Sequence, residues 1–344
     1  MSGADPSMAG GELPVWRLLE LGIAEPARAQ TFVEALAEAV GRGLAPNTLI
    51  IVRPSAPYVS LGFHQSFREE IDPGFLERRR LPVLRRVEGG GTTYLDRDQL
   101  FYQLVYRDDG GGPGGPGDLA HYLAAPVRAA RQLGLPASLR PPSDIVVGDR
   151  KVSGNAGGDW EGAHILVGGF LLRTDHRAMA DLYRLPDPAL RPLLRREVER
   201  AVSSWEAEAG TVPRAEELTT QLVTAFEAEG LFRVRPGAPT TAEEARFRSE
   251  TLVRHGDPSW RELPPSSSST PGLVRRIRIA GPRGLLVFSA PGADRYLAAV
   301  VAGPELIEVY SVTPGHPSAL ESLPPGAPER PELERLVASA PRFD

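Results

Sequence analysis

The sequence contains no cysteine among its 344 residues, which excludes disulfide bonds, thiolate metal ligands and any cysteine nucleophile. It also lacks a long apolar run, since candidates such as residues 165–172 fall far short of the roughly 20 residues of a membrane-spanning helix. The first residues show no basic segment followed by an apolar stretch, so no signal peptide is expected. A net charge of −5 disfavours a general nucleic-acid binder. We therefore expect a cytoplasmic protein that binds neither membranes nor nucleic acids.

Lysine is nearly absent as well. All but one of the 39 basic residues are arginine, and the exception is Lys151. A lysine offers a compact ammonium on a slim stem, which fits a tight site that would not admit a planar guanidinium. The alternative interpretation is an exposed hairpin tip, because Gly-Asp-Arg-Lys is also ordinary turn chemistry. The uniqueness of Lys151 favours the functional interpretation.

Composition shifts divide the chain into four parts. Residues 1–12 are rich in glycine, serine and alanine and are expected to be disordered. Residues 13–262 form a large domain, and residues 263–271 form a Pro/Ser linker. Residues 272–344 are expected to fold as a small α+β domain.

Apolar periodicity and turn residues predict the local elements. Helices are expected at residues 26–43, 75–80, 119–133, 177–183, 190–202 and 214–229. Strands are expected at residues 48–53, 58–61, 82–86, 99–106, 145–147, 151–153, 164–172, 273–279, 284–289, 296–301 and 306–312. Two short helical stretches are expected to close the chain.

One candidate binding segment runs from Arg85 to Tyr94, where a strand delivers arginines to a glycine-rich turn. Glycines let the backbone approach a phosphate with its N–H groups, and arginine binds phosphate through two parallel hydrogen bonds. Glycine triplets are common, so this segment alone is weak evidence. No P-loop motif occurs in the chain.

A second candidate segment surrounds the lysine. Asp144 begins a strand, a hairpin follows, and Lys151 leads into small residues that leave room beside its ammonium. Such a lysine could stabilise a carbonyl oxygen on which negative charge develops.

Together these segments resemble the lipoate–protein ligase family, which carries R-R-x-S-G-G-G-x-x-x-x-D followed by N-D-(x)n-G-x-K-[IV]-S-G-x-A. The matching residues are Arg85, Arg86, Gly89, Gly90, Gly91, Asp96, Asp144, Lys151, Val152, Ser153, Gly154 and Ala156. The resemblance spans about residues 15–260 and, because both motifs occur in order, is unlikely to be chance.

The resemblance implies an α/β (α+β) fold with a mixed, largely antiparallel sheet flanked by helices, as in biotin ligases and class II synthetases. It also implies a two-step reaction: ATP, with Mg²⁺, activates lipoic or octanoic acid as acyl-AMP, and the acyl group then passes to a lysine. The implied acceptors are lipoyl domains of 2-oxoacid dehydrogenases or the glycine-cleavage H protein. No permanently bound cofactor is implied.

By the same resemblance, Lys151 binds the acyl carbonyl and Asp144 orients the lysine. The implied substrate- and nucleotide-binding residues are Arg85, Arg86, Gly89, Gly90, Gly91, Ser153, Gly154, Ala156 and Gly169. Gly169 belongs to this set because the strand at residues 164–172 is expected to line an apolar acyl slot. Metal ligands are not identified: Asp96 and Asp98 could hold Mg²⁺, although a solvated turn is the commoner fate of such a pair.

Several positions depart from the family pattern. Glu88 stands where serine is usual, Ser143 replaces asparagine and Leu95 replaces a histidine. Glu88 could hold a Mg²⁺ on the ATP phosphates, or it could pair with Arg85 or Arg86 and remove that arginine from the nucleotide.

Three alternatives remain open at this point. The chain could be an octanoyl or lipoyl transferase, which without cysteine would need a mechanism other than an acyl-cysteine intermediate. It could be a non-catalytic acyl- or adenylate-binding homologue. A biotin ligase is a third possibility, but the G-R-G-R-x-G segment of that family is missing.

Overall fold

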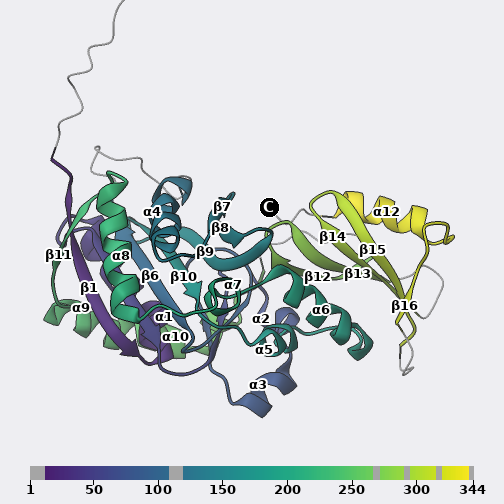
Figure 1. The fold of residues 1–344 in the computed structure, drawn as a ribbon. Helices are drawn as coiled ribbons and strands as arrows, with labels where there is room; N and C mark the ends of the chain where they lie inside the picture. The colour runs from purple at the N-terminus through teal and green to yellow at the C-terminus, as the bar shows by residue number, and fades with distance from the viewer. Residues whose placement is uncertain (1–11, 108–118, 266–271, 290–294, 315–319, 341–344) are drawn as a thin grey trace, which may run out of the picture.

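The computed structural model describes residues 12–107, 119–265, 272–289, 295–314 and 320–340. An eight-stranded mixed sheet lies at its centre, in the order β11-β1-β2-β6-β10-β9-β8-β7 (Figure 1). Its strands are β1 (Val15–Ala24), β2 (Thr48–Pro54), β6 (Gln99–Tyr106), β7 (Ser138–Arg140), β8 (Asp144–Val147), β9 (Arg150–Trp160), β10 (Ala163–Leu171) and β11 (Arg233–Pro236). β1 runs parallel to β2 and β11, whereas the remaining pairs are antiparallel.

Alternating apolar side chains cover both faces of this sheet. On one face, α1 (Pro26–Gly41) buries Phe32 and Leu36 against residues such as Val105. On the other face, α4 (Leu119–Gln132) and α8 (Ala215–Ala228) cover residues such as Tyr102 and Leu104. The sheet is therefore buried on both sides. A pocket on either face of the sheet can form only where the covering helices and loops leave space.

A second, three-stranded sheet lies beside α1 and carries the glycine-rich segment. Its order is β4-β3-β5, with β3 (Tyr58–Leu61), β4 (Val83–Arg85) and β5 (Thr93–Leu95). The short helices α2 (Phe67–Glu70) and α3 (Pro73–Arg79) fall between β3 and β4 in the chain. The glycine turn, which contains Gly89, Gly90 and Gly91, connects β4 to β5. It is therefore held at both ends by strands.

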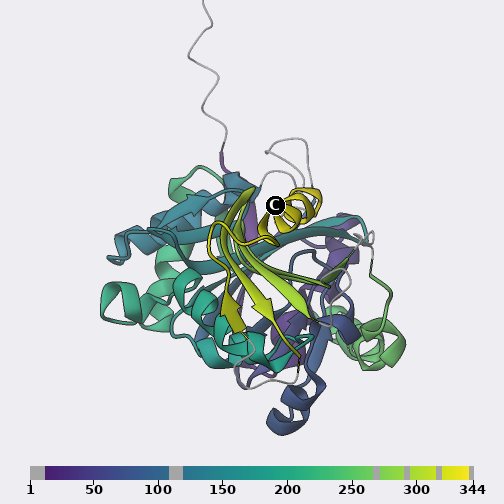
Figure 2. The same cartoon turned by 90° about the vertical axis from the view of Figure 1, so that its right-hand side faces the viewer.

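The C-terminal residues form a separate antiparallel sheet, in the order β12-β13-β14-β15-β16. Its elements are β12 (Leu273–Ala280), β13 (Arg283–Ser289), β14 (Tyr296–Ala302), β15 (Glu305–Val312), β16 (Leu320–Ser322) and α12 (Arg330–Ser339). One face packs on α5 (His176–Asp181) and α6 (Arg191–Ala201), and the other face is covered by α12 (Figure 1). Figure 2, turned by 90°, shows this sheet in front of the central one.

The remaining helices complete the described chain. They are η2 (Pro188–Leu190), α7 (Trp205–Ala209), α9 (Thr241–Arg246), η3 (Phe247–Thr251), α10 (Leu252–Gly256) and α11 (Pro258–Arg261). None of the described helices is long and apolar enough to cross a membrane.

The predicted fold class, a mixed sheet with flanking helices and a small C-terminal unit, is confirmed. The strand predicted at residues 99–106 coincides with β6, and all its residues are buried. The chain closes with β16 and one described helix rather than two helical stretches. Most of the expected N-terminal disorder (residues 1–11) and most of the linker (266–271) lie outside the described residues.

Candidate active site

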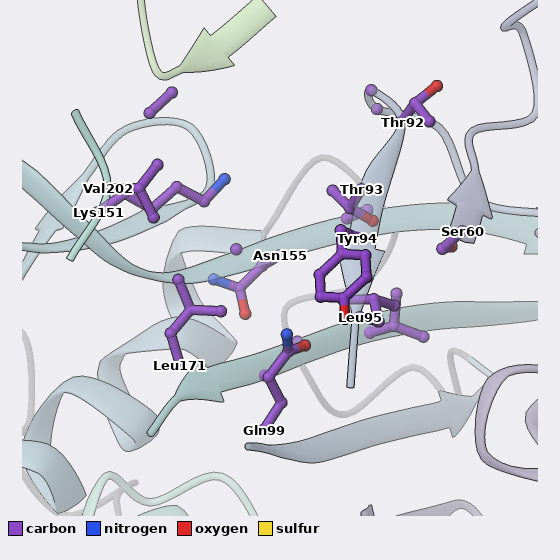
Figure 3. A pocket seen from close by; sticks show the side chains of 18 of the residues that line it. Ser60, Thr92, Thr93, Tyr94, Leu95, Gln99, Lys151, Asn155, Leu171 and Val202 are labelled. Carbon is purple, nitrogen blue, oxygen red and sulfur yellow. The ribbon is translucent and has the colours of Figure 1, made fainter. Parts of the chain in front are cut away.

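A pocket of about 210 Å³ opens between the central sheet, the glycine turn and the C-terminal sheet. Figure 3 shows Lys151 and Val202 on the left, Ser60 and Thr92 on the right, Asn155 near the middle, and Leu171 and Gln99 below. Apolar wall residues include Phe101, Val167, Leu171, Met179 and Val198. The pocket thus combines an apolar interior with a few polar groups, which is typical of a site for a small organic ligand.

Lys151 is fixed in this pocket by its backbone and by its charge. Its backbone pairs with Val146 in the β8–β9 hairpin, and its carbonyl oxygen accepts a 2.8 Å hydrogen bond from the Ser203 amide. The Lys151 ammonium lies 2.7 Å from Oδ1 of Asp144. The stem passes over Gly154, where a methyl group would stand 2.8 Å from Cε of the lysine. Gly154 therefore provides the space that the lysine occupies.

Asp144 is almost completely buried and receives two cations. Arg140 donates a 2.9 Å hydrogen bond to Oδ2, on the side of the carboxylate opposite to the lysine. Burial by itself favours the neutral carboxyl, but the Lys151 ammonium and the hydrogen bonds from Lys151 and Arg140 outweigh it and lower the pKa of Asp144 to about 2. Asp144 is thus ionised at neutral pH and forms an ion pair with the lysine.

Arg86 lines the pocket, but its donors are already used. Nε and Nη2 donate to the Gly89 carbonyl at 3.1 and 2.6 Å, Nη2 also donates to Gly91 at 2.9 Å, and Nη1 donates to the Ser60 hydroxyl at 3.1 Å. The guanidinium therefore holds the glycine turn in shape by binding its carbonyl oxygens. Gly90 and Gly91 line the pocket, whereas Gly89 does not.

Arg85 is not brought to the pocket. Its side chain is fully buried on the other side of β4 and donates to six backbone carbonyl oxygens. The acceptors are Gly62, Phe63, Gln65, Trp260, Arg261 and Leu263, at 2.5 to 3.2 Å. The expected nucleotide contact from Arg85 is therefore wrong, because this arginine joins two loops inside the protein.

Glu88 fits neither of its two expected roles. Its carboxyl is fully buried, lies outside the pocket lining and has no hydrogen-bond partner on either oxygen among the described residues. Burial raises its pKa to about 8, the Glu34 carboxylate adds to this, and attraction from Arg86 only partly offsets it. The predicted pairing with an arginine is wrong, and so is the predicted metal contact, because the carboxyl is sealed away from the pocket.

The remaining predicted residues also divide into those that line the pocket and those that lie outside its lining. Ala156 and Gly169 line the pocket together with Gly154. Ser153 is fully buried beneath it, and its hydroxyl lies 3.3 Å from that of Tyr102. Within the described residues no group of three or more His, Asp or Glu side chains could hold a metal ion.

Sequence reasoning missed several pocket residues. They are Gln30, Gln99, Gln103, Tyr183 and Arg278. The two β6 glutamines carried a signal, since Gln99 begins and Gln103 interrupts an otherwise apolar and aromatic strand. The place of Arg278 depends on how the C-terminal sheet packs against the rest of the protein, which local sequence does not show.

The sequence matches the model of the lipoyl protein ligase A/B catalytic domain over residues 25–227. The chain belongs to this family. The predicted resemblance is confirmed, and the protein is an enzyme of the lipoate/octanoate ligase and transferase group, which transfers acyl groups to lysine. The alternative of a non-catalytic homologue is not supported.

Two kinds of relative within the family are similar to this chain. Octanoyltransferase LipM of Kyrpidia tusciae is 28% identical, over 72% of this chain and 98% of the relative. Lipoate-protein ligase LplJ of Bacillus subtilis is 36% identical, but over only 29% of each chain. The full-length similarity is therefore to a transferase, and the ligase similarity is local.

Solved structures show the same fold. The bipartite lipoate protein ligase of Thermoplasma acidophilum, described with its E2 lipoyl domain, matches with a TM-score of 0.63 at 23% identity, over 74% of this chain and 99% of that one. Lipoate-protein ligase A bound with ATP matches with a TM-score of 0.60 at 22% identity, over 72% of this chain and 98% of that one.

Proposed function

We propose that this enzyme is an octanoyl or lipoyl transferase that works without a cysteine. In this proposal it moves the acyl group from a thioester donor to a lysine of a lipoyl domain or of a glycine-cleavage H protein. The full-length similarity to octanoyltransferases supports the reaction. The absence of cysteine from the sequence requires a transfer without an acyl-cysteine intermediate.

The observation that carries the proposal is the hydrogen bonding of the Arg86 guanidinium. A ligase that adenylates its substrate needs donors for the nucleotide phosphates, and an arginine beside a glycine turn is the expected one. Here that guanidinium donates to Gly89, Gly91 and Ser60 instead. A thioester is already activated, so its transfer needs no nucleotide at this turn.

The chemistry assigned to the pocket is direct aminolysis. The acceptor amine attacks the thioester carbonyl, a C–N bond forms, the C–S bond breaks, and the proton lost by the amine leaves with the thiol. The Lys151 ammonium, held by Asp144, donates a hydrogen bond to the carbonyl oxygen as negative charge develops on it. The apolar walls around Gly169 and Val167 take the acyl chain.

An ATP-dependent lipoate or octanoate ligase is the second candidate. It is favoured by the Lys151 motif and by the local 36% identity to lipoate-protein ligase LplJ. In that reaction ATP and Mg²⁺ are substrates, and the same ammonium contacts the carbonyl of the acyl-adenylate.

A direct comparison of donors tests the proposal. The purified chain is incubated with a lipoyl domain or H protein and either an octanoyl thioester or octanoate with ATP and Mg²⁺, and the acceptor mass is measured. We expect the octanoyl mass increase with the thioester alone. Modification only in the presence of ATP, accompanied by pyrophosphate release, would replace the transferase with the ligase.

A further inference from the structure

The C-terminal sheet forms part of the pocket wall. Arg278, Ile279 and Ala280 at the end of β12 line the pocket together with residues of the central sheet. Side chains normally alternate between the two faces of a strand, but the pairing of β12 with β13 shifts register between Arg278 and Ala280. This irregularity explains how consecutive residues reach the same cavity.

β12 is held against the rest of the pocket by specific contacts. Arg275 donates to both carboxylate oxygens of Glu70 at 3.1 and 3.0 Å in a nearly buried ion pair. The Tyr183 hydroxyl donates to the Thr92 carbonyl at 2.7 Å and lies 3.5 Å from the Arg278 carbonyl oxygen. The backbone of Arg278 is therefore positioned beside the segment that follows the glycine turn.

Three cations line the pocket, and two of them are engaged. Arg86 donates to the carbonyl oxygens of the glycine turn, and Lys151 pairs with Asp144. Arg278 is half-buried and has no ion pair or side-chain hydrogen bond within the described part of the chain. Among the three cations that line the pocket, Arg278 is thus the one without such a partner in the described part of the chain.

We propose that Arg278 binds a phosphate ester of the acyl donor, so that the C-terminal sheet supplies a substrate contact to the active site. A guanidinium with free donors recognises phosphate through paired, charge-assisted hydrogen bonds. This inference rests on the proposed function, because it assumes that an acyl donor binds in the pocket. The phosphate could belong to a phosphopantetheine thioester or to an acyl-adenylate, and both place it beyond the acyl carbonyl.

Calorimetry tests the contact without requiring turnover. The probes are octanoyl-phosphopantetheine against octanoyl-pantetheine, and octanoyl-AMP against 5′-O-octanoyl-adenosine. The full chain is compared with Arg278→Gln, with Arg278→Lys, which keeps the charge but not the planar fork, and with Arg335→Gln. Arg335 is an exposed arginine of the same C-terminal unit and serves as the control.

We expect one phosphate-bearing probe to bind the wild type at least about tenfold more tightly than its phosphate-free partner. Arg278→Gln should abolish that preference, Arg278→Lys should restore part of it, and Arg335→Gln should keep it. Equal binding of both members in both pairs, or an unchanged preference in Arg278→Gln, would overturn the inference. A preference confined to octanoyl-AMP would support the Arg278 contact with phosphate but contradict the proposal that the donor is a thioester. Failure of all thioesters to support acyl transfer would contradict the proposed function and leave the Arg278 contact intact.

Discussion

The ammonium of Lys151 lies 2.7 Å from Oδ1 of Asp144, and the opposite oxygen of the same carboxylate accepts a hydrogen bond from Arg140. The only lysine of the chain is therefore held by an aspartate that is itself fixed by a second cation. This arrangement limits the movement of the ammonium. The proposed role of Lys151 depends on this geometry.

Replacing the lysine should remove activity with little loss of structure. Lys151→Met keeps the length of the side chain but removes the donor, and we expect a decrease in kcat of about 100-fold or more. Lys151→Arg keeps the charge, but we expect the wider guanidinium to misplace the donors in the space above Gly154 that the lysine occupies, so a comparable decrease is expected. Acceptor mass and circular dichroism measure activity and folding. An arginine variant within a few-fold of the wild type would make Lys151 only a surface cation.

Asp144→Asn should reduce activity less than loss of the lysine does. The amide preserves the shape and can still accept a hydrogen bond, but it leaves the ammonium without its anion. Because the pKa of Asp144 is lowered to about 2, its stabilising contribution is present above the unfolded value near 4 and is lost only as the pH falls through 2. The wild-type activity profile should therefore show no acid limb from Asp144 above about pH 4. An Asp144-dependent limb near neutral pH would contradict the assignment.

The elements that the sequence predicted correctly are those that depend on residues close together in the chain. The strand at residues 99–106 and the hairpin that carries Lys151 follow from local pattern, and both are present in the structure. β1 was missed; it pairs with β2 and also, across the whole central domain, with β11, where Val15 pairs with Arg233. Periodicity within a short window contains no information about such a pair.

The partners of charged groups were the least predictable part. Arg85 and Arg86 are adjacent in a phosphate-binding type of motif, yet both guanidiniums bind carbonyl oxygens. Their acceptors come from segments such as residues 260–263, which reach Arg85 only through tertiary packing. The choice between a backbone carbonyl and a substrate phosphate is therefore set by the fold.

Glu88 should make the protein less stable as the pH rises. Its pKa is raised to about 8 in the folded state, so the carboxyl is neutral there while the unfolded chain ionises near 4.5. The neutral carboxyl makes its full contribution to the free energy of unfolding below the unfolded pKa. This contribution is lost as the pH rises from about 4.5 to 8, and the loss is on the order of 5 kcal/mol. Glu88→Gln mimics the neutral form and should flatten this dependence. Urea unfolding at several pH values measures it, and parallel curves for both proteins would contradict the buried neutral carboxyl.

The glycine turn offers a matched pair of substitutions. Gly90 has φ +90°, and an added Cβ would stand 2.9 Å from Nη2 of Arg86, whereas a Cβ at Gly89 meets nothing within 4 Å. Gly90→Ala should therefore destabilise the protein by about 1–3 kcal/mol and reduce activity. Gly89→Ala should be close to neutral in both respects. Thermal unfolding and acceptor mass measure the two effects, and equal behaviour of the two variants would show that the turn does not depend on its contact with Arg86.

Gly169 should set the length of acyl chain that the pocket accepts. An added Cβ at this position would stand 2.6 Å from Cδ1 of Phe101, which lines the same cavity. Gly169→Ala would therefore have to displace the Phe101 ring, at a cost of about 1–3 kcal/mol, and the displaced ring would narrow the slot. We expect octanoyl donors to lose affinity about tenfold while butanoyl donors change little, since only the longer chain needs the full depth. Calorimetry with both donors measures this difference, with Gly89→Ala as the control for an alanine placed outside the pocket. An equal loss for both chain lengths would mean that Gly169 supports the fold without selecting the substrate.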